Sequence, residues 1–185
     1  MPIISKNIRI RYPEHFKVGE NSIIDDFCYF STRVEIGDFS HVATGVSVAG
    51  GVARLFKLGS FGGVSAGARI WCTTDDFVND IVTVLPEWLE AEGEIKENLI
   101  SGDIIMDDFT VVGSNAVVMP RNHIPEGTMI GALSFVPADF EFKPWSVYGG
   151  VPLRLLKPRN QASVMRQFEK VQERLRRIEQ TKERK

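Results

Sequence analysis

Few side chains in this sequence are suited to proton transfer or to nucleophilic attack. Its three histidines are His15, His41 and His123, and an imidazole with its ordinary pKa of about 6.5 is well suited to take a proton at neutral pH. The two cysteines cannot build a disulfide framework, and no Cys or His spacing typical of a zinc site occurs. The residue types therefore favour proton-transfer chemistry and predict no bound metal.

Acidic side chains are concentrated in residues 71–100, which hold eight acids and a single base. The acids are Asp75, Asp76, Asp80, Glu87, Glu90, Glu92, Glu94 and Glu97. Aromatic residues among them, including Trp71 and Trp88, need other groups to pack on, which argues against disorder. A long loop in a compact domain is usually functional, so this stretch is a candidate for substrate contacts. A solvated turn at Asp75 and Asp76 is the alternative.

The elements that position these residues follow from a repeat with a period of six residues. Large apolar residues recur at this spacing, beside small or turn-forming residues such as Gly37 and Gly59. The apolar positions are Ile24, Phe30, Ile36, Val42 and Val48, then Leu58, Val64 and Ile70, then Ile105, Val111 and Val117, and, after a shift of one residue, Ile124, Ile130, Val136 and Phe142.

This period fits neither a helix, with about 3.6 residues per turn, nor an alternating strand, with a period of about 2. Three short strands in each coil of about 18 residues place the apolar side chains in one shared interior. The repeat therefore predicts a β-solenoid. A β-sandwich is the alternative, but its strands alternate and do not keep one phase across their turns.

The repeat resembles the left-handed parallel β-helix of the hexapeptide-repeat acyltransferases, over roughly residues 4–159. The resemblance implies an all-β fold: a left-handed parallel β-helix solenoid over residues 1–158, with an inserted loop at 71–100. It also implies a homotrimer with sites between adjacent solenoids. The last segment, residues 159–185, spaces its apolar residues by four and three, which predicts an amphipathic helix packed on its own solenoid or on a neighbouring chain.

Within the loop, the string Cys72-Thr-Thr-Asp-Asp-Phe77, followed by Pro86-Glu87, is similar to the subfamily that acylates amino groups on nucleotide-linked sugars. This resemblance implies substrate contacts by Asp75, Asp76 and Glu87, which could take a proton or orient a sugar ammonium. Relatives that acylate hydroxyl groups often carry a histidine in the corresponding loop, and this loop has none. An amine is also easier to activate than a hydroxyl, so the amine acceptor is favoured.

His41 lies one residue before Val42 of the repeat, so its side chain should point out of the coil. The string from Ile36 to Gly51 is similar to the histidine-bearing coil of sugar acetyltransferases. In the bacillosamine- and sialic-acid-type relatives the catalytic base lies nine residues earlier, where this sequence has Thr32. By the same resemblance, the backbone N–H of Gly50 lines the oxyanion site. Whether His41 or a loop carboxylate is the base stays open.

The late coils and the segment after them resemble the family's coenzyme A site. The residues that this resemblance places at the donor are Gly113, Ser114, Gly131, Ala132, Arg154, Lys157 and Arg159. Small residues let an extended pantetheine lie against the backbone, and basic residues are suitable partners for phosphates. The resemblance therefore implies acetyl-CoA as the acyl donor.

The composition is that of a globular protein, with 43% hydrophobic and 25% charged residues. A net charge of −2 leaves no basic face for nucleic acid, and no apolar run predicts a membrane span or a leader, so we expect a cytoplasmic protein. The sequence predicts an acyl-CoA-dependent N-acyltransferase for a nucleotide-linked amino sugar of a surface glycan (O-antigen, S-layer or capsule). The alternatives are a sugar O-acetyltransferase with His41 as general base and an inactive solenoid that serves as an assembly subunit.

Overall fold

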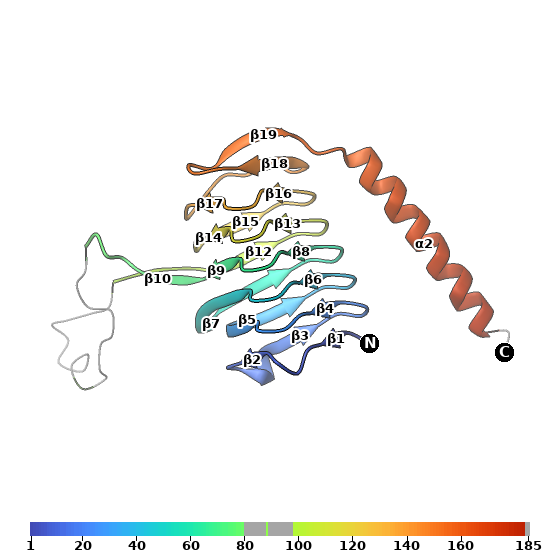
Figure 1. Ribbon diagram of the computed structural model, residues 1–185, viewed down its shortest axis with the longest axis horizontal. Helices are drawn as coiled ribbons and strands as arrows, with labels where there is room; N and C mark the ends of the chain where they lie inside the picture. The colour runs from blue at the N-terminus through green and yellow to red at the C-terminus, as the bar shows by residue number, and fades with distance from the viewer. Residues whose placement is uncertain (80–87, 89–97, 184–185) are drawn as a thin grey trace.

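The structure is a computed structural model, which describes residues 1–79, 88 and 98–183. Short strands wind into a parallel β-solenoid of about 6 turns, and one long helix, α2 (Gln161–Glu183), lies beside it (Figure 1). The predicted solenoid with a C-terminal helix is therefore confirmed. None of the helices in this part of the chain has the length and hydropathy needed to cross a membrane.

One side of the solenoid is an eight-stranded sheet. Its strands, in spatial order, are β1 (Ile3–Ile4), β4 (Ile23–Ile24), β6 (His41–Val42), β8 (Gly63–Val64), β13 (Val111–Val112), β16 (Met129–Ile130), β18 (Ser146–Gly149) and β19 (Arg154–Pro158). All neighbours are parallel except β18 and β19, which pair antiparallel at the last coil.

The other two sides form a nine-stranded sheet in which β5 (Tyr29–Ile36) and β7 (Ser47–Leu58) span both. The first part of β7 pairs with β9 and its last part with β12, so the strand bends around a corner. The remaining strands are β2 (Arg9–Ile10), β3 (Phe16–Val18), β9 (Arg69–Trp71), β12 (Ile104–Met106), β14 (Val117–Val118), β15 (Asn122–Ile124) and β17 (Phe135–Val136). A short 3-10 helix, η1 (Pro13–His15), precedes β3.

Inward-facing side chains of successive coils stack into one continuous core. In the eight-stranded sheet, residues that pair across coils are fully buried: Ile24, Val42, Val64, Val112 and Ile130. Tyr148 of β18 continues this row at the last coil. Each coil alone exposes its apolar residues, so stacking supplies the burial that holds the short strands in place.

The predicted phase of the repeat is wrong for three residues after the insertion. The structure buries Met106, Val112 and Val118 completely, whereas the predicted Ile105, Val111 and Val117 are only partly buried. Adjacent residues of a strand face opposite sides, so an error of one residue exchanges the inner and outer faces. Both members of each pair are apolar, and hydrophobicity alone therefore could not choose between them.

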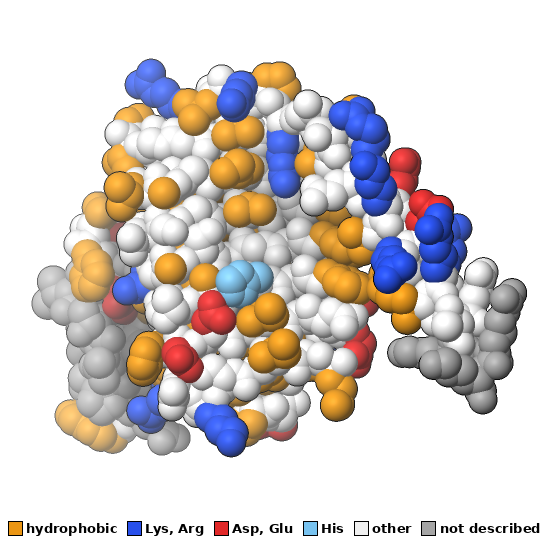
Figure 2. Space-filling model, turned by 45° about the vertical axis from the view of Figure 1, so that its right-hand side comes forward, with side chains coloured by type: hydrophobic (Ala, Val, Ile, Leu, Met, Phe, Trp, Pro, Cys, Tyr) orange, Lys and Arg blue, Asp and Glu red, His pale blue; other side chains and the backbone are white. Residues whose placement is uncertain are grey.

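Helix α2 docks against a column of aromatic rings outside one corner of the solenoid. Phe39, Phe61 and Phe109 follow one another in this column, with ring centroids 5.0 and 5.5 Å apart. Phe168 of α2 packs edge-on against Phe61 and Phe109, at 5.1 and 5.3 Å. Figure 2 shows hydrophobic side chains between the helix and the solenoid, with Lys and Arg on the outer side of the helix. The helix thus packs on its own solenoid through its first half.

Candidate active site

The insertion leaves the solenoid at the corner that follows β9. Its base is an antiparallel ribbon of β10 (Thr73–Asp75) and β11 (Leu99–Ser101), which projects from the side of the solenoid away from α2 (Figure 1). Gly102 then leads the chain back into β12, and its N–H donates to the carbonyl of Cys72 at 2.9 Å. The predicted site residue Glu87 lies outside the described residues.

The two adjacent aspartates at the end of β10 differ in what their carboxylates do. Asp76 accepts hydrogen bonds from the N–H of Val78 at 3.1 Å and from the Nδ2 of Asn79 at 2.8 Å, and so holds its own turn. The carboxylate of Asp75 is partly buried and makes no hydrogen bond or ion pair within the described part of the chain. Of the two aspartates, Asp76 is thus the one whose carboxylate is used by its own turn.

A second irregular segment, residues 50–54 of β7, lies at the same corner, one coil before the insertion. We call this segment the excursion. β7 has 12 residues and β5 has 8, and the register between the two strands shifts on either side of Thr32. Thr32 is buried, and its hydroxyl lies 3.0 Å from the carbonyl oxygen of Gly51 and 2.7 Å from that of Arg54. Thr32 stands where the bacillosamine- and sialic-acid-type relatives carry a histidine. Its side chain therefore holds the excursion in place and is not exposed to solvent.

Gly50 permits close contact between the excursion and the insertion. A Cβ atom at Gly50 would lie 2.5 Å from the Cβ of Cys72, which leaves no space for a side chain. The carbonyl of Ala49 accepts the N–H of Cys72 at 2.6 Å. Because a trans peptide holds its C=O and N–H on opposite sides, the N–H of Gly50 is directed toward the preceding coil.

Cys72 itself is unsuited to nucleophilic catalysis. Its thiol is buried, and burial raises the pKa of Cys72 to about 12. The nearby charge of Asp103 also raises this pKa, whereas a backbone hydrogen bond at Ile104 lowers it. Only the thiolate attacks a thioester readily, so the geometry favours direct transfer of the acyl group over a cysteinyl intermediate.

His41 lies on the outer face of β6 and pairs with a carboxylate that the sequence analysis missed. Its Nε2 is 2.9 Å from Oδ2 of Asp25, and both side chains are about half exposed, at 52% and 41%. Asp25 could have been found from the repeat, because His41 pairs with Ile23 of the preceding coil. With Nε2 bonded to Asp25, Nδ1 is the ring nitrogen left for a substrate proton.

The same geometry recurs at His123, whose Nε2 lies 2.8 Å from Oδ2 of Asp107. In both pairs the aspartate precedes the histidine by 16 residues. An outward histidine therefore meets an aspartate through the coil repeat alone, and the pair does not by itself identify a base. His123 lies on β15, in the other sheet from His41.

Two of the predicted catalytic residues, His41 and Asp75, lie in different parts of the chain. His41 belongs to β6 of the eight-stranded sheet, whereas Asp75 leaves the solenoid from β9 of the nine-stranded sheet. The ribbon that carries Asp75 projects away from the solenoid, so it does not fold back over β6 (Figure 1).

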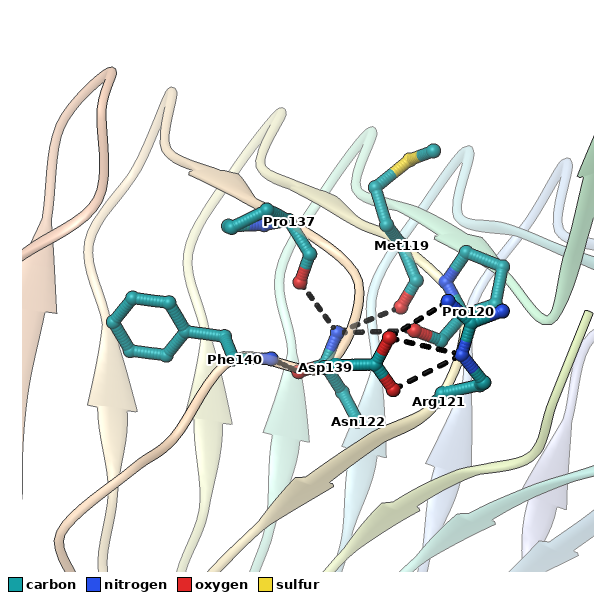
Figure 3. Close-up of polar contacts among 7 residues, drawn as sticks. All are labelled: Met119, Pro120, Arg121, Asn122, Pro137, Asp139 and Phe140. Carbon is teal, nitrogen blue, oxygen red and sulfur yellow. Dashed lines mark hydrogen bonds and ion pairs between the residues drawn. The ribbon is translucent and has the colours of Figure 1, made fainter. Parts of the chain in front are cut away.

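The corner beyond the insertion is held by side-chain hydrogen bonds and contacts the residue at which the insertion ends. Asn122 is buried; its Nδ2 donates to the carbonyls of Met119 at 2.8 Å and Pro137 at 2.9 Å (Figure 3). Arg121 forms a two-point ion pair with Asp139, which lowers the pKa of that carboxyl. A Cβ atom on Gly102 would lie 2.2 Å from Cγ of Arg121, so the end of the insertion packs directly under this corner.

The small residues predicted at the donor lie together at one corner of the late coils. Gly113 is buried, and a Cβ atom there would lie 2.4 Å from the backbone nitrogen of Ala132. The carbonyl of Ser114 accepts the N–H of Leu133 at 2.9 Å, while Gly131 and Ala132 remain partly or fully exposed. The exposed part of this corner thus consists of backbone and small side chains.

The three basic residues predicted to bind phosphates have different environments. Arg154 and Lys157 lie exposed on β19, and neither forms an ion pair with any described residue. Arg159 instead donates from Nη1 to the carbonyls of Phe109 and Gly127, and its guanidinium lies 6.0 Å from the Trp145 ring centroid. Partial burial lowers the pKa of Arg159. Its side chain therefore anchors the start of α2.

No group of three or more His, Cys, Asp or Glu side chains in the described residues is arranged to hold a metal ion.

No family model matches the chain. It is 26% identical to dTDP-4-amino-4,6-dideoxy-D-glucose acyltransferase of Escherichia coli over 152 residues, which cover 80% of this chain and 73% of the relative. It is also 26% identical to chloramphenicol acetyltransferase of Agrobacterium fabrum over 150 residues, 75% of this chain and 68% of the relative.

Among solved structures, the chain is similar to AntD, an N-acyltransferase from Bacillus cereus. The AntD complex with dTDP and 3-hydroxybutyryl-CoA has a TM-score of 0.80 and 28% identity, covering 93% of this chain and 87% of that one. An AntD variant in complex with dTDP-4-amino-4,6-dideoxyglucose and coenzyme A has a TM-score of 0.82 at 28% identity, covering 93% and 88%. The chain is therefore an acyltransferase, and its six-residue repeat and β-solenoid are consistent with the hexapeptide-repeat acyltransferases.

Proposed function

We propose that this protein transfers an acyl group from acyl-CoA to the amino group of a nucleotide-linked amino sugar. The observation that carries the proposal is the likeness to AntD over 93% of the chain, in a complex that holds a dTDP-linked amino sugar together with coenzyme A. The Escherichia coli relative is named for the same acceptor. The acceptor is therefore a dTDP-linked 4-amino-4,6-dideoxyhexose or a close analogue, made in the cytoplasm for a surface glycan.

The active site is built between two copies of the chain, in a homotrimer. This arrangement explains why His41 and Asp75 lie in different parts of one solenoid. The solved AntD variants replace a serine and an aspartate that are ten residues apart in that chain. Here Ser65 and Asp75 have that spacing, and Ser65 follows the strand that pairs with β6.

The reaction forms one carbon–nitrogen bond and breaks one carbon–sulfur bond. The sugar ammonium first loses one proton, and the resulting amine attacks the thioester carbonyl carbon. The carbon–sulfur bond then breaks, and the second proton lost by the nitrogen goes to the departing thiolate of coenzyme A. Asp75 binds the ammonium form of the sugar and takes its proton. A positioned general base of this kind raises the reaction rate by about 10²- to 10⁴-fold. The oxyanion needs a hydrogen-bond donor, and because the N–H of Gly50 is directed toward the preceding coil, this donor has to come from another group at the site.

The donor lies along the late coils. Its pantetheine follows the corner formed by Gly113, Ser114, Gly131 and Ala132, where the small side chains let it approach the backbone closely. Arg154 and Lys157 bind the phosphates, because their charges are unpaired among the described residues. Arg159 supports this end of the site by holding the start of α2.

The test is free-thiol release from acetyl-CoA and from a longer acyl-CoA, with matched pairs of dTDP sugars that carry either an amine or a hydroxyl. Release only with the amine is expected. Release with the hydroxyl sugars supports O-acetylation instead. The absence of any release, with every donor and acceptor, would favour the inactive assembly subunit.

The second candidate, an O-acetyltransferase, would use His41 as its general base, because the His41 side chain is half exposed on the outer face of β6. If the acceptor is an amine, His41→Asn is expected to lower kcat by less than about tenfold, because an amine needs little activation. If the acceptor is a hydroxyl, the loss should be about 10²-fold or more. His123→Asn is the matched control, since it removes an imidazole with the same aspartate geometry from the other sheet. Equal effects of the two substitutions would remove His41 from the mechanism.

A further inference from the structure

We propose that Arg54 is a positioning residue that clamps the base of the insertion and fixes where Asp75 meets the acceptor. The inference rests on the proposed acyl transfer to an amino sugar. It adds a residue that touches neither substrate and that belongs to the excursion of β7, outside the insertion itself. Neither the repeat nor the loop motif singled out this residue.

Arg54 begins a chain of hydrogen bonds that runs across the base of the ribbon. Its Nε lies 2.7 Å from Oγ of Ser101, which lies 2.9 Å from Oγ1 of Thr73. The hydroxyl of Thr73 in turn lies 3.2 Å from the carbonyl oxygen of Gly50. The chain therefore starts and ends in the excursion and passes through both strands of the ribbon.

The direction of this chain is determined by its two ends. A guanidinium can only donate and a carbonyl oxygen can only accept. Ser101 therefore accepts from Arg54 and donates to Thr73, and Thr73 donates to Gly50. Both hydroxyl rotors are fixed, so the ribbon has one preferred orientation at its base.

Further contacts hold the excursion in place, so that Arg54 is a fixed point. The N–H of Leu55 donates to Oδ1 of Asp103 at 2.9 Å, where the insertion rejoins the solenoid. The buried hydroxyl of Thr32 holds the carbonyl of Arg54 from the preceding coil, at 2.7 Å. Arg54 is thus tied to the coil before the insertion as well as to the insertion's last residues.

The clamp determines which way Asp75 faces. Thr73 and Asp75 are two residues apart in β10, so their side chains lie on the same face of the ribbon. Thr73 pairs with Ser101 and Asp75 with Leu99. An isolated two-stranded ribbon is at best marginally stable in water, so its direction depends on the contacts at its base. Fixing the Thr73 hydroxyl therefore fixes the face that presents the Asp75 carboxylate.

The first measurement needs no substrate. In Arg54→Ala, amide hydrogen exchange at Asp76 and Gly102, whose N–H groups bond to Asn98 and Cys72, is expected to be at least about tenfold faster than in the wild type. Thr73→Val should behave similarly, because it keeps the side-chain shape and loses the hydroxyl. Thr73→Ser keeps the hydroxyl and should restore slow exchange.

The second measurement uses the acyl-transfer reaction. Arg54→Ala and Thr73→Val are expected to raise KM for the amino sugar by roughly tenfold, while the Kd for acyl-CoA stays unchanged. Thr110→Val is the control, because it removes a buried hydroxyl that bonds to the Asp107 carbonyl at a different corner. It should cost stability without changing KM for the acceptor. The double variant Arg54→Ala/Ser101→Ala should be no worse than either single variant.

The outcomes separate the clamp from the proposed function. Unchanged exchange in Arg54→Ala would overturn the clamp. Faster exchange with an unchanged acceptor KM, in an active enzyme, would overturn its role in positioning the substrate. A wild-type protein that acylates no amino sugar would contradict the proposed function, and the exchange data alone would then decide whether the clamp exists.

Discussion

Asp75→Asn is expected to lower kcat/KM for the amino-sugar acceptor by about 10²- to 10³-fold, the range for loss of a positioned proton acceptor. The Asp75 carboxylate is partly buried and has no hydrogen-bond partner among the described residues, so a substrate ammonium would be its main partner. Asparagine keeps the size of the side chain and removes its charge and basicity. Steady-state kinetics with saturating acyl-CoA measure the effect, and Kd for acyl-CoA should not change.

The neighbouring residue supplies the control. Asp76→Asn removes the same charge, one position along the chain, from a carboxylate that holds its own turn through Val78 and Asn79. An asparagine oxygen can still accept one of these bonds, so kcat/KM should fall by less than about tenfold. A larger loss for Asp76→Asn than for Asp75→Asn would show that the roles of the two aspartates are reversed.

Phe30→Ala is expected to destabilise the solenoid by about 3–5 kcal/mol, the usual cost of truncating a buried phenylalanine. Phe30 is fully buried, and its ring centroid lies 4.9 Å from that of Phe16 in the same end of the solenoid. Its loss opens a cavity that the stacked coils cannot close, because each coil is held on both sides by its neighbours. The midpoint of urea unfolding, followed by circular dichroism, measures the change.

Phe27→Ala is the matched control in the same coil. Phe27 is 73% exposed at a corner, so its truncation leaves no cavity and should change the free energy of unfolding by less than about 1 kcal/mol. A similar shift for Phe27 and Phe30 would mean that Phe30 is not part of a close-packed core. It would also contradict the assignment of inward and outward residues in the first coils.

The sequence alone determined the solenoid, the place of its interruption and the C-terminal helix. The reason is that a six-residue apolar period is a local signal, which each coil repeats independently of the others. The period did not determine which residue of each pair after the insertion points inward. At Ile105 and Met106, as at Val111 and Val112, both residues are apolar, and only the pairing with earlier coils decided their faces.

The candidate site residues followed from their types and from motif resemblance, but their roles depend on contacts between coils. The sequence could not separate Asp75 from Asp76, because the difference lies in a turn that satisfies one carboxylate. It could not show that the guanidinium of Arg159 donates hydrogen bonds to the carbonyls of Phe109 and Gly127. These partners lie 50 and 32 residues away, across the aromatic column on which α2 docks.

The partners of His41 and Arg54 were determined only by the tertiary structure. Asp25 lies 16 residues before His41, and Ser101 lies 47 residues after Arg54. The separation of 16 residues along the sequence follows from the length of one coil. The separation of 47 residues depends on the length of the insertion and on the excursion that contacts its base. The repeat predicts which side chains stack inside the coil, but contacts outside it depend on how the irregular segments are held together.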